Sequence, residues 1–232
     1  MKIVISGTYS TGKTLTSIAL SSLTGIPVTH ARTMRELLVS NLPGKKLEKC
    51  NFHELIELGT RRFSERIIAE KSMKGSFITD GCPLQEWLYG TTRMMTGLNP
   101  AEKSWKINLH KVIFSKEWDV FKDMLYGIGT VAKDYTKNNY DKFVHLPIEF
   151  PFDPDGHRPT SEKFRKKSEE LLMQTYEELG INVLSVSGSL EERLQKIVDS
   201  YKLNIQMPIK RAIEIAYKMK KEKFDNTRLE MS

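Results

Sequence analysis

The stretch GTYSTGKT at residues 7–14 constrains the fold of this chain more than any other feature. It follows the apolar run IVIS and precedes LTSIALSSL, whose apolar residues recur at helical spacing. Gly7 and Gly12 allow backbone angles that a β-carbon penalises, and a loop of this kind can turn its N–H groups inward to form an anion nest. The helix that follows directs the positive end of its dipole at the same point. The stretch therefore predicts a strand, a phosphate-binding loop and a helix, in that order.

The residues of this loop also have predicted roles toward ATP and Mg²⁺. Their pattern is G-x-x-x-x-G-K-[ST], the Walker A or P-loop pattern. Lys13 carries a full charge that can reach the outer phosphates, and the hydroxyl of Thr14 suits Mg²⁺. The predicted nucleotide-binding residues are Gly7, Thr8, Tyr9, Ser10, Thr11, Gly12, Lys13 and Thr14.

Length and composition fit a soluble globular protein. The 232 residues are enough for one α/β domain or for such a domain with a modest extension. No window approaches the roughly 18 apolar residues that a membrane span requires, and Lys2 is followed by a core strand rather than a signal peptide. Cys50 and Cys82 do not have the spacing of metal ligands. We therefore expect a reduced, cytoplasmic setting and no membrane partner.

Strands and helices are expected to alternate along the chain. We expect strands within 2–6, 25–32, 76–80, 142–151 and 181–188, with a mostly helical acceptor-side segment at 84–140. This order predicts an α/β fold with a doubly wound, parallel, five-stranded sheet. A P-loop kinase-like domain would cover 1–201, with a basic, lid-like segment at 152–168, and a basic C-terminal helix would cover 202–232. Ligands bind at the carboxyl ends of the strands in such sheets.

Two of the expected helices carry local signals. Thr33 and Glu36 have the spacing of a capping box, and PGKK at 43–46 ends the helix that they begin. Residues 53–73 have apolar residues at helical spacing, which predicts an amphipathic helix. Its apolar face would include Leu55, Ile56, Phe63, Ile67 and Ile68, and its polar side would carry Arg61, Arg62 and Arg66.

Two residues outside the loop are predicted to serve phosphoryl transfer together with Lys13. Asp80 ends the third strand, where a carboxylate can orient Mg²⁺ or accept the proton of an acceptor hydroxyl. Both roles stay open from the sequence. Arg158 lies in DGHRP, after the fourth strand. An arginine that closes over the transferring phosphoryl group stabilises the charge that gathers there.

Acceptor recognition has several candidate residues. Aromatic rings can stack on a base, and arginines can bind a phosphate. The candidates are Arg32, Arg35, Glu36, Trp87, Tyr89, Arg93 and Arg165. Each of them is equally explained as a residue of the core, the rim or a solvated face. His145, in the middle of the fourth strand, is expected to be a core residue.

With these features together, the sequence resembles the AAA-domain family that includes the nicotinamide riboside kinase domain of NadR-type proteins. The resemblance rests on GTYSTGKT (7–14), ITDG (78–81), YDKFVHLPIEFPFDPDGHRP (140–159) and VSGSLEERL (186–194). It implies ATP-dependent phosphorylation of a small, nucleoside-like compound at a hydroxyl group. It also implies that Asp80 and Arg158 belong to the phosphoryl-transfer site. The middle segment is longer than that family leads us to expect, and the basic C-terminal helix is an addition.

Two other functions remain open. The net charge of +7 and the pI of about 9.2 would suit a kinase of a modified base or an end within a nucleic acid. A nucleotide-dependent regulatory NTPase would need the same loop without a small acceptor. The leading hypothesis is a kinase whose acceptor is a small nucleoside- or nucleotide-like molecule.

Overall fold

The computed structural model describes residues 1–29, 31–46, 49–96, 115–151 and 161–230, and the side chains of 35 and 223–230 are outside this description. The strands are β1 (Lys2–Ser6), β2 (Val28–Thr29), β3 (Phe77–Asp80), β4 (Lys142–His145) and β5 (Val183–Ser185). The helices are α1 (Lys13–Thr24), α2 (Met34–Asn41), α3 (Phe52–Ser72), α4 (Pro83–Thr96), α6 (Ser115–Asn139), α7 (Glu162–Glu178), α8 (Leu190–Tyr201) and α9 (Ile209–Glu230).

The five strands form one parallel sheet in the order β2-β3-β1-β4-β5. Strand β1 is the central strand of this order. Its middle residues are all apolar, as expected for a strand that is covered on both faces of a parallel sheet. In the register of the sheet, Ile5 lies opposite Asp80 of β3, and Ser6 lies opposite His145 of β4. The predicted five-stranded parallel sheet is therefore confirmed, and β1, β3 and β4 end at the same edge.

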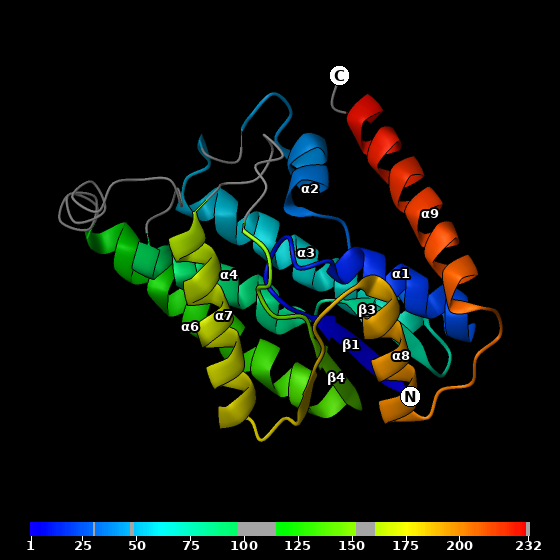
Figure 1. The fold of residues 1–232 in the computed structure, drawn as a ribbon. Coiled ribbons are helices and arrows are strands. Elements are labelled where there is room, and N and C mark those ends of the chain that lie inside the picture. Colours follow the sequence, from blue (N-terminus) through cyan, green and yellow to red (C-terminus); the bar gives the residue numbers. More distant parts are fainter. Residues whose placement is uncertain (30, 47–48, 97–114, 152–160, 231–232) are drawn as a thin grey trace.

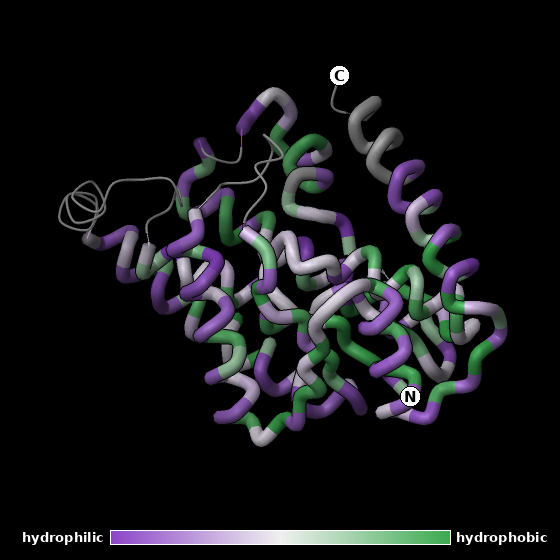
Figure 2. Tube along the Cα trace, in the orientation of Figure 1, coloured by the Kyte–Doolittle hydropathy of each residue, from purple (hydrophilic) through white to green (hydrophobic). Residues whose placement is uncertain are grey.

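Helices cover both faces of this sheet (Figure 1). Successive side chains of a strand point to opposite faces, so Ile3 and Ile5 pack in a core cluster with α1, α8 and α9, whereas Val4 packs in a second cluster with α4, α6 and α7. Figure 2 shows β1 as a hydrophobic stretch in the middle of the molecule. The two clusters hold the sheet from both sides and fix the positions of its strand ends.

Strands β4 and β5 are shorter than the sequence predicted. The predicted strand of 142–151 ends at His145, and the one within 181–188 covers only Val183–Ser185. Pro147 and Pro151 interrupt the stretch after β4, and proline has no N–H group to donate to a neighbouring strand. The residues after β4 therefore leave the sheet and run along its carboxyl edge.

The buried face of helix α3 differs from the predicted one at two residues. Arg66 is only 1% exposed, whereas Ile68 is 69% exposed, so both were placed on the wrong side. Arg66 lies about three helical turns after Leu55 and shares its face, and Leu55 is buried. The apolar residues Ile67 and Ile68 suggested a continuous stripe, but helical geometry places Ile68 on the opposite side of the helix.

The C-terminal helix α9 contributes to the main core. Its residues Ala212 and Ala216 are fully buried in the cluster with α1 and α8. The predicted domain boundary at residue 201 stays a prediction. Within the described part of the chain, no helix combines the length and the apolar character that crossing a membrane requires.

Candidate active site

The loop between β1 and α1 has the backbone that its two glycines were expected to provide. Gly7 has a φ of +141°, and a Cβ there would lie 2.6 Å from the carbonyl oxygen of Leu146. Gly12 is the N-cap residue of α1 and has a φ of 94°, in the left-handed region. Side chains at these two positions would strain the backbone or collide with it. The loop can therefore turn tightly and direct the start of α1 toward the carboxyl edge of the sheet.

Lys13 and Thr14 form the first turn of α1. The ammonium group of Lys13 donates a hydrogen bond to the carbonyl oxygen of Thr8, at 2.5 Å, so its side chain folds back across the loop. The Thr11 hydroxyl donates to the same carbonyl oxygen at 2.9 Å. The loop thus carries a cation on the side where its helix begins.

The hydroxyl of Thr14 donates to the carboxylate of Asp80, with 2.5 Å between the two oxygen atoms. This contact follows from the sheet, because β1 and β3 are parallel neighbours and Asp80 lies opposite Ile5. A hydroxyl and a carboxylate oxygen are hard ligands of the type that Mg²⁺ takes together with water and substrate phosphates. The pair therefore fits a magnesium ion bound with a nucleotide. Among the described residues, no group of three or more His, Cys, Asp and Glu side chains could hold a metal by itself.

The buried Arg66 of α3 holds the turn that follows Asp80. Its guanidinium group donates to the carbonyl oxygens of Asp80 and Gly81, both at 3.1 Å, and to the Glu86 carboxylate at 2.8 Å. Burial favours the neutral form of Arg66, but Glu86, Tyr140 and Glu70 together outweigh burial and raise its pKa. Burial acts on Glu86 as well, yet Arg66 and Arg62 hold its pKa below the ordinary value. The backbone of Asp80 is thus fixed by a buried ion pair, which the sequence did not reveal.

Gln85 is a second residue that sequence reasoning missed. Its side-chain amide donates to the carbonyl oxygen of Gly7 and accepts a hydrogen bond from the backbone N–H of Cys82, at 3.0 Å. Gln85 therefore ties the start of α4 to the start of the loop. Its position three residues after Cys82, at a predicted helix start, is the one local signal that could have found it.

Arg165 and Arg193 also contact the loop. Arg165, a predicted substrate-binding residue, donates to the carbonyl oxygens of Tyr9 at 3.2 Å and of Phe150 at 2.7 Å. Arg193, which was not predicted, donates to the carbonyl oxygen of Thr11 at 2.8 Å. Both side chains lie against the loop's backbone and are buried.

The candidate acceptor residues do not gather at one place. Arg32 pairs with Glu65, and the Glu36 carboxylate accepts from the backbone N–H of Thr33. Thr33 accepts from the N–H of Glu36 at 3.3 Å, so the predicted capping box is confirmed. The side chain of Arg35 and the whole of Arg158 lie outside the described residues.

Trp87 packs between helices. The Lys133 ammonium lies 5.0 Å from the centre of its ring, and Gly129 of α6 leaves room for its indole. This is the packing role that the sequence left open as an alternative to base stacking.

Tyr89 and Arg93, by contrast, lie beside the loop. The rings of Tyr9 and Tyr89 each stack on Phe164 with 6.0 Å between ring centres, and the Arg93 guanidinium lies 5.9 Å from the Phe164 ring centre. Burial lowers the pKa of Arg93 to about 10, although Cys50 and Tyr9 oppose the shift. An aromatic and cationic group therefore borders the third residue of the loop.

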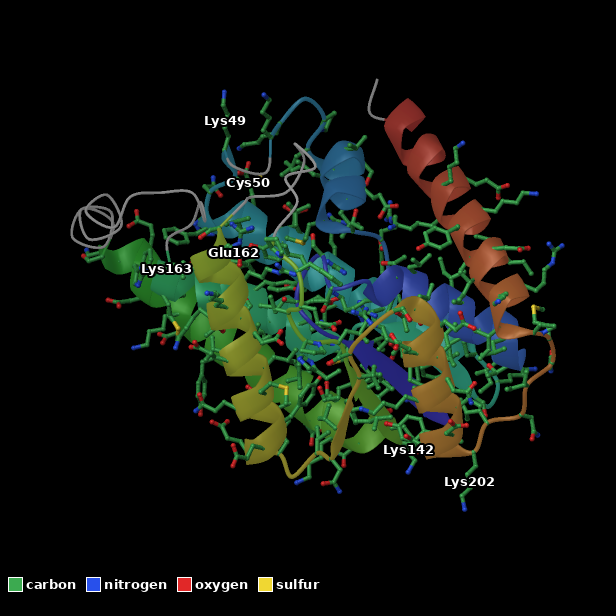
Figure 3. All side chains as sticks on the ribbon, in the orientation of Figure 1. Lys49, Cys50, Lys142, Glu162, Lys163 and Lys202 are labelled. Carbon is green, nitrogen blue, oxygen red and sulfur yellow. The ribbon has the colours of Figure 1, made fainter. Side chains whose placement is uncertain are left out.

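These elements meet on one side of the molecule. Figure 3 shows Glu162, at the start of α7, and Cys50, before α3, on the side opposite to Lys142, which begins β4. The carboxyl edge of the sheet is thus surrounded by the loop, α4, α7 and the start of α3. His145, at the end of β4, contacts Ser6 at 3.1 Å and Glu169 at 2.9 Å and is buried, as expected for a core residue.

Comparisons with known proteins give matches to a family and to solved structures. A sequence model of the AAA domain family matches residues 2–193. No curated protein matches the chain in sequence.

Deoxyadenosine kinase from M. mycoides with bound dATP is 15% identical, with a TM-score of 0.60 over 87% of this chain and 99% of that chain. The same enzyme with products dCMP and a flexible dCDP is 14% identical, with a TM-score of 0.52 over 87% and 98% of the two chains. The NadR protein in complex with NAD and AMP-PNP is 12% identical, with a TM-score of 0.56 over 89% of this chain and 51% of that chain. At these identities each structural match shows a shared fold.

Proposed function

The chain belongs to the AAA domain family, whose sequence model spans residues 2–193, and from this premise we propose that it is an ATP-dependent kinase. Its acceptor would be a hydroxyl group of a small nucleoside- or nucleotide-like molecule. Solved structures of the same fold include a deoxyadenosine kinase, which supports an acceptor of this class.

The contact between Thr14 and Asp80 is the observation that carries the proposal. It lies where the first turn of α1, which also carries Lys13, meets the end of β3. In a phosphoryl-transfer site the protein mainly positions the reactants and stabilises charge. We assign the loop N–H groups and Lys13 to the phosphates of ATP and Thr14 to Mg²⁺, with Asp80 either as a second magnesium residue or as the general base. Bound Mg²⁺ would neutralise charge on the phosphate oxygens.

The aromatic group beside the loop suits the acceptor. Tyr89 presents an aromatic ring that stacks on the buried Phe164, and Arg93 adds a positive charge at the same place. Rings of this kind stack on a base, and a guanidinium group binds a phosphate or a carboxylate. Arg158 keeps its predicted role over the transferring phosphoryl group on the strength of its sequence setting.

A nucleic-acid acceptor is a second candidate, because one observation favours it. Lys218, Lys220 and Lys221 of α9 are exposed, and this end of the helix projects on the side of the molecule where α2 lies (Figure 1). A basic helix can add phosphate contacts to a polynucleotide. The net charge of +7 is consistent with such a contact.

An acceptor screen tests the proposal and separates the alternatives. Wild-type protein and Lys13→Ala are incubated with Mg-ATP and, in separate reactions, with nucleosides, nucleoside monophosphates, polynucleotides or no acceptor. We expect ADP release that rises only with a small hydroxyl compound. We expect none from Lys13→Ala, because the charge facing the outer phosphates is lost.

Thermal melting of the wild-type and Lys13→Ala proteins is the control for folding, and the two melting temperatures should agree. Turnover by well-folded Lys13→Ala at the wild-type rate would refute the nucleotide site. A rise only with polynucleotide would select the second candidate, and turnover without any acceptor would select a regulatory NTPase.

A further inference from the structure

Two buried arginines bind three consecutive carbonyl groups of the phosphate-binding loop. Arg165 of α7 donates to the carbonyl oxygens of Tyr9 at 3.2 Å and Ser10 at 3.4 Å. Arg193 of α8 donates to that of Thr11 at 2.8 Å. Arg165 is 0% exposed and Arg193 is 6% exposed, so neither side chain is available to grip a substrate from solution.

Peptide geometry gives these contacts a consequence for the other side of the loop. In a trans peptide unit, the carbonyl group of one residue and the N–H of the next point in opposite directions, and the described chain has no cis peptide bond. Carbonyl groups held by the arginines therefore direct the N–H groups of Ser10, Thr11 and Gly12 away from them. Inward N–H groups on successive residues are what an anion nest requires.

We propose that Arg165 and Arg193 are positioning residues that hold the loop in its anion-binding form. This inference rests on the proposed nucleotide site and adds to it the residues that shape it. Either arginine would act through the loop backbone, without touching the nucleotide itself.

The two arginines are themselves fixed by one segment. Arg165 donates to the carbonyl oxygen of Phe150 at 2.7 Å, and Arg193 forms an ion pair with Glu149. The other oxygen of Glu149 accepts from the N–H of Gly188 at 2.7 Å, in the turn before α8. The residues after β4 thus set the orientation of both guanidinium groups. Burial of a charged group is costly unless it is hydrogen-bonded, and these contacts offset that cost for Arg165 and for the two terminal nitrogens of Arg193.

Arginine is suited to this task in a way that lysine is not. Each guanidinium group reaches two or more oxygens at once, from the loop and from residues 149–150. A lysine keeps the charge but loses the planar fork of donors. The conservative variants Arg165→Lys and Arg193→Lys therefore keep the positive charge of the side chain but change the geometry of its hydrogen bonds to the loop.

The test measures binding of Mg-ADP and of inorganic tripolyphosphate by calorimetry. We expect each lysine variant to bind both ligands on the order of tenfold more weakly, the effect of losing one charge-assisted hydrogen bond. The loss should be equal for the two ligands, because tripolyphosphate has no base or sugar and shares only the phosphates. A general weakening of the fold would instead lower the melting temperature, without an equal loss of affinity for Mg-ADP and tripolyphosphate.

Lys196→Gln is the matched control. Lys196 lies in the same helix as Arg193, and its ammonium also donates to a carbonyl oxygen, that of Ser185, at 3.0 Å. Ser185 lies in β5, outside the loop, so this variant should bind both ligands as the wild type does. An equal loss in Lys196→Gln would mean that the loss of any contact between an α8 cation and a carbonyl group weakens binding, and that would overturn the inference.

Wild-type affinity in well-folded lysine variants would also overturn it. If the lysine variants do not fold, Glu149→Gln decides, since it removes the ion pair of Arg193 and keeps an oxygen for Gly188. Weaker binding of both ligands by Glu149→Gln then supports the inference, and unchanged binding rejects it. A wild-type protein that binds neither ligand would remove the proposed function and this inference with it.

Discussion

Asp80 has two candidate roles, and one substitution separates them. Asp80→Asn keeps the shape of the side chain and an oxygen for the Thr14 hydroxyl. If Asp80 is the general base, turnover should fall by about 10²- to 10⁴-fold while Mg-ADP affinity changes little, because a base acts only as the hydroxyl proton leaves. Single-turnover rates and Mg-ADP titrations measure the two effects.

Asp141→Asn is the control for this change. Asp141 accepts from the backbone N–H of Lys2 at 2.7 Å, at the opposite edge of the sheet, so its loss should leave both quantities unchanged. A loss of Mg-ADP binding in Asp80→Asn would instead assign Asp80 to the metal. The next candidate base would then be Glu36, whose carboxylate accepts from the backbone N–H of Thr33 in its own helix cap.

At the residue scale, the sequence was informative where the signal is local. The loop is one continuous stretch, and its glycines, lysine and threonine carry their roles within eight positions. Arg193 and Thr11 are 182 positions apart, and arginines at helical spacing are equally typical of a solvated face. Only the folded chain shows that Arg66, Arg165 and Arg193 turn inward, toward backbone carbonyl groups.

Among the elements, α3 carries a buried carboxylate that should make stability depend on pH. Glu70 accepts from Tyr140 at 2.7 Å, from Tyr135 at 3.1 Å and from Thr79 at 3.1 Å. Burial raises the pKa of Glu70 above its ordinary value, although Arg66 and these hydroxyl groups oppose the shift. The native state therefore binds the Glu70 proton more tightly than the unfolded chain does.

The sign of the effect follows from linkage. Stability that comes from a raised carboxyl pKa is fully present below the unfolded pKa and is lost as the pH rises through the folded pKa. The free energy of unfolding of the wild type, minus that of Glu70→Gln, should thus decrease as the pH rises from the ordinary carboxyl pKa of about 4 through the raised pKa of Glu70.

Urea denaturation across this pH range measures the difference. Glu57→Gln, at an exposed position of the same helix, is the control and should show no such trend. A difference for Glu70→Gln that stays flat or increases with pH would contradict the raised pKa.

Helix starts were easier to predict than strand ends, for a physical reason. A capping box such as that of Thr33 and Glu36 closes within one turn and depends on neighbouring residues alone. The end of β4 depends on its partner β5, which pairs only through Val183–Ser185. The buried face of α3 likewise depends on what packs against it. The hydroxyl groups around Glu70 donate hydrogen bonds to its carboxylate and so stabilise a polar residue at this buried position.

For the whole molecule, the excess positive charge can be tested on α9. If its exposed lysines are only solvated, changing Lys218, Lys220 and Lys221 together to glutamine should leave turnover with a small acceptor within about twofold, as is usual for surface substitutions. If the acceptor is a polynucleotide, the same variant should bind it more weakly and with a flatter salt dependence, by roughly 0.9 per lost phosphate contact.

A variant with Lys116, Lys122 and Lys137 of α6 changed to glutamine removes the same charge from another part of the surface. Equal effects of the two triple variants would point to net charge rather than to a contact on α9. A flattened salt slope in the α9 variant alone would rule out a free small molecule as the only acceptor.

The architecture was predictable because several independent signals in the sequence indicate the same fold. Strands and helices alternate, polar residues follow the strands at one end, and the loop motif stands after the first strand. The resemblance to the AAA-domain family is confirmed by the match to residues 2–193 and by the shared fold with NadR. The grouping that we propose for the acceptor was not predictable, because Tyr9, Tyr89, Arg93 and Phe164 come from three separate segments that only the fold brings together.

The central place of β1 has a consequence for the growing chain on the ribosome. Ser6 contacts His145, which is synthesised 139 positions later, an interval on the order of ten seconds at about 5–20 residues per second. Until β3 and β4 emerge, both edges of this apolar strand lack their partners, and unpaired edges attract other chains. The segment that we propose to bind the nucleotide is therefore synthesised well before its sheet is complete, so translation speed before residue 145 should govern how much of the protein escapes aggregation.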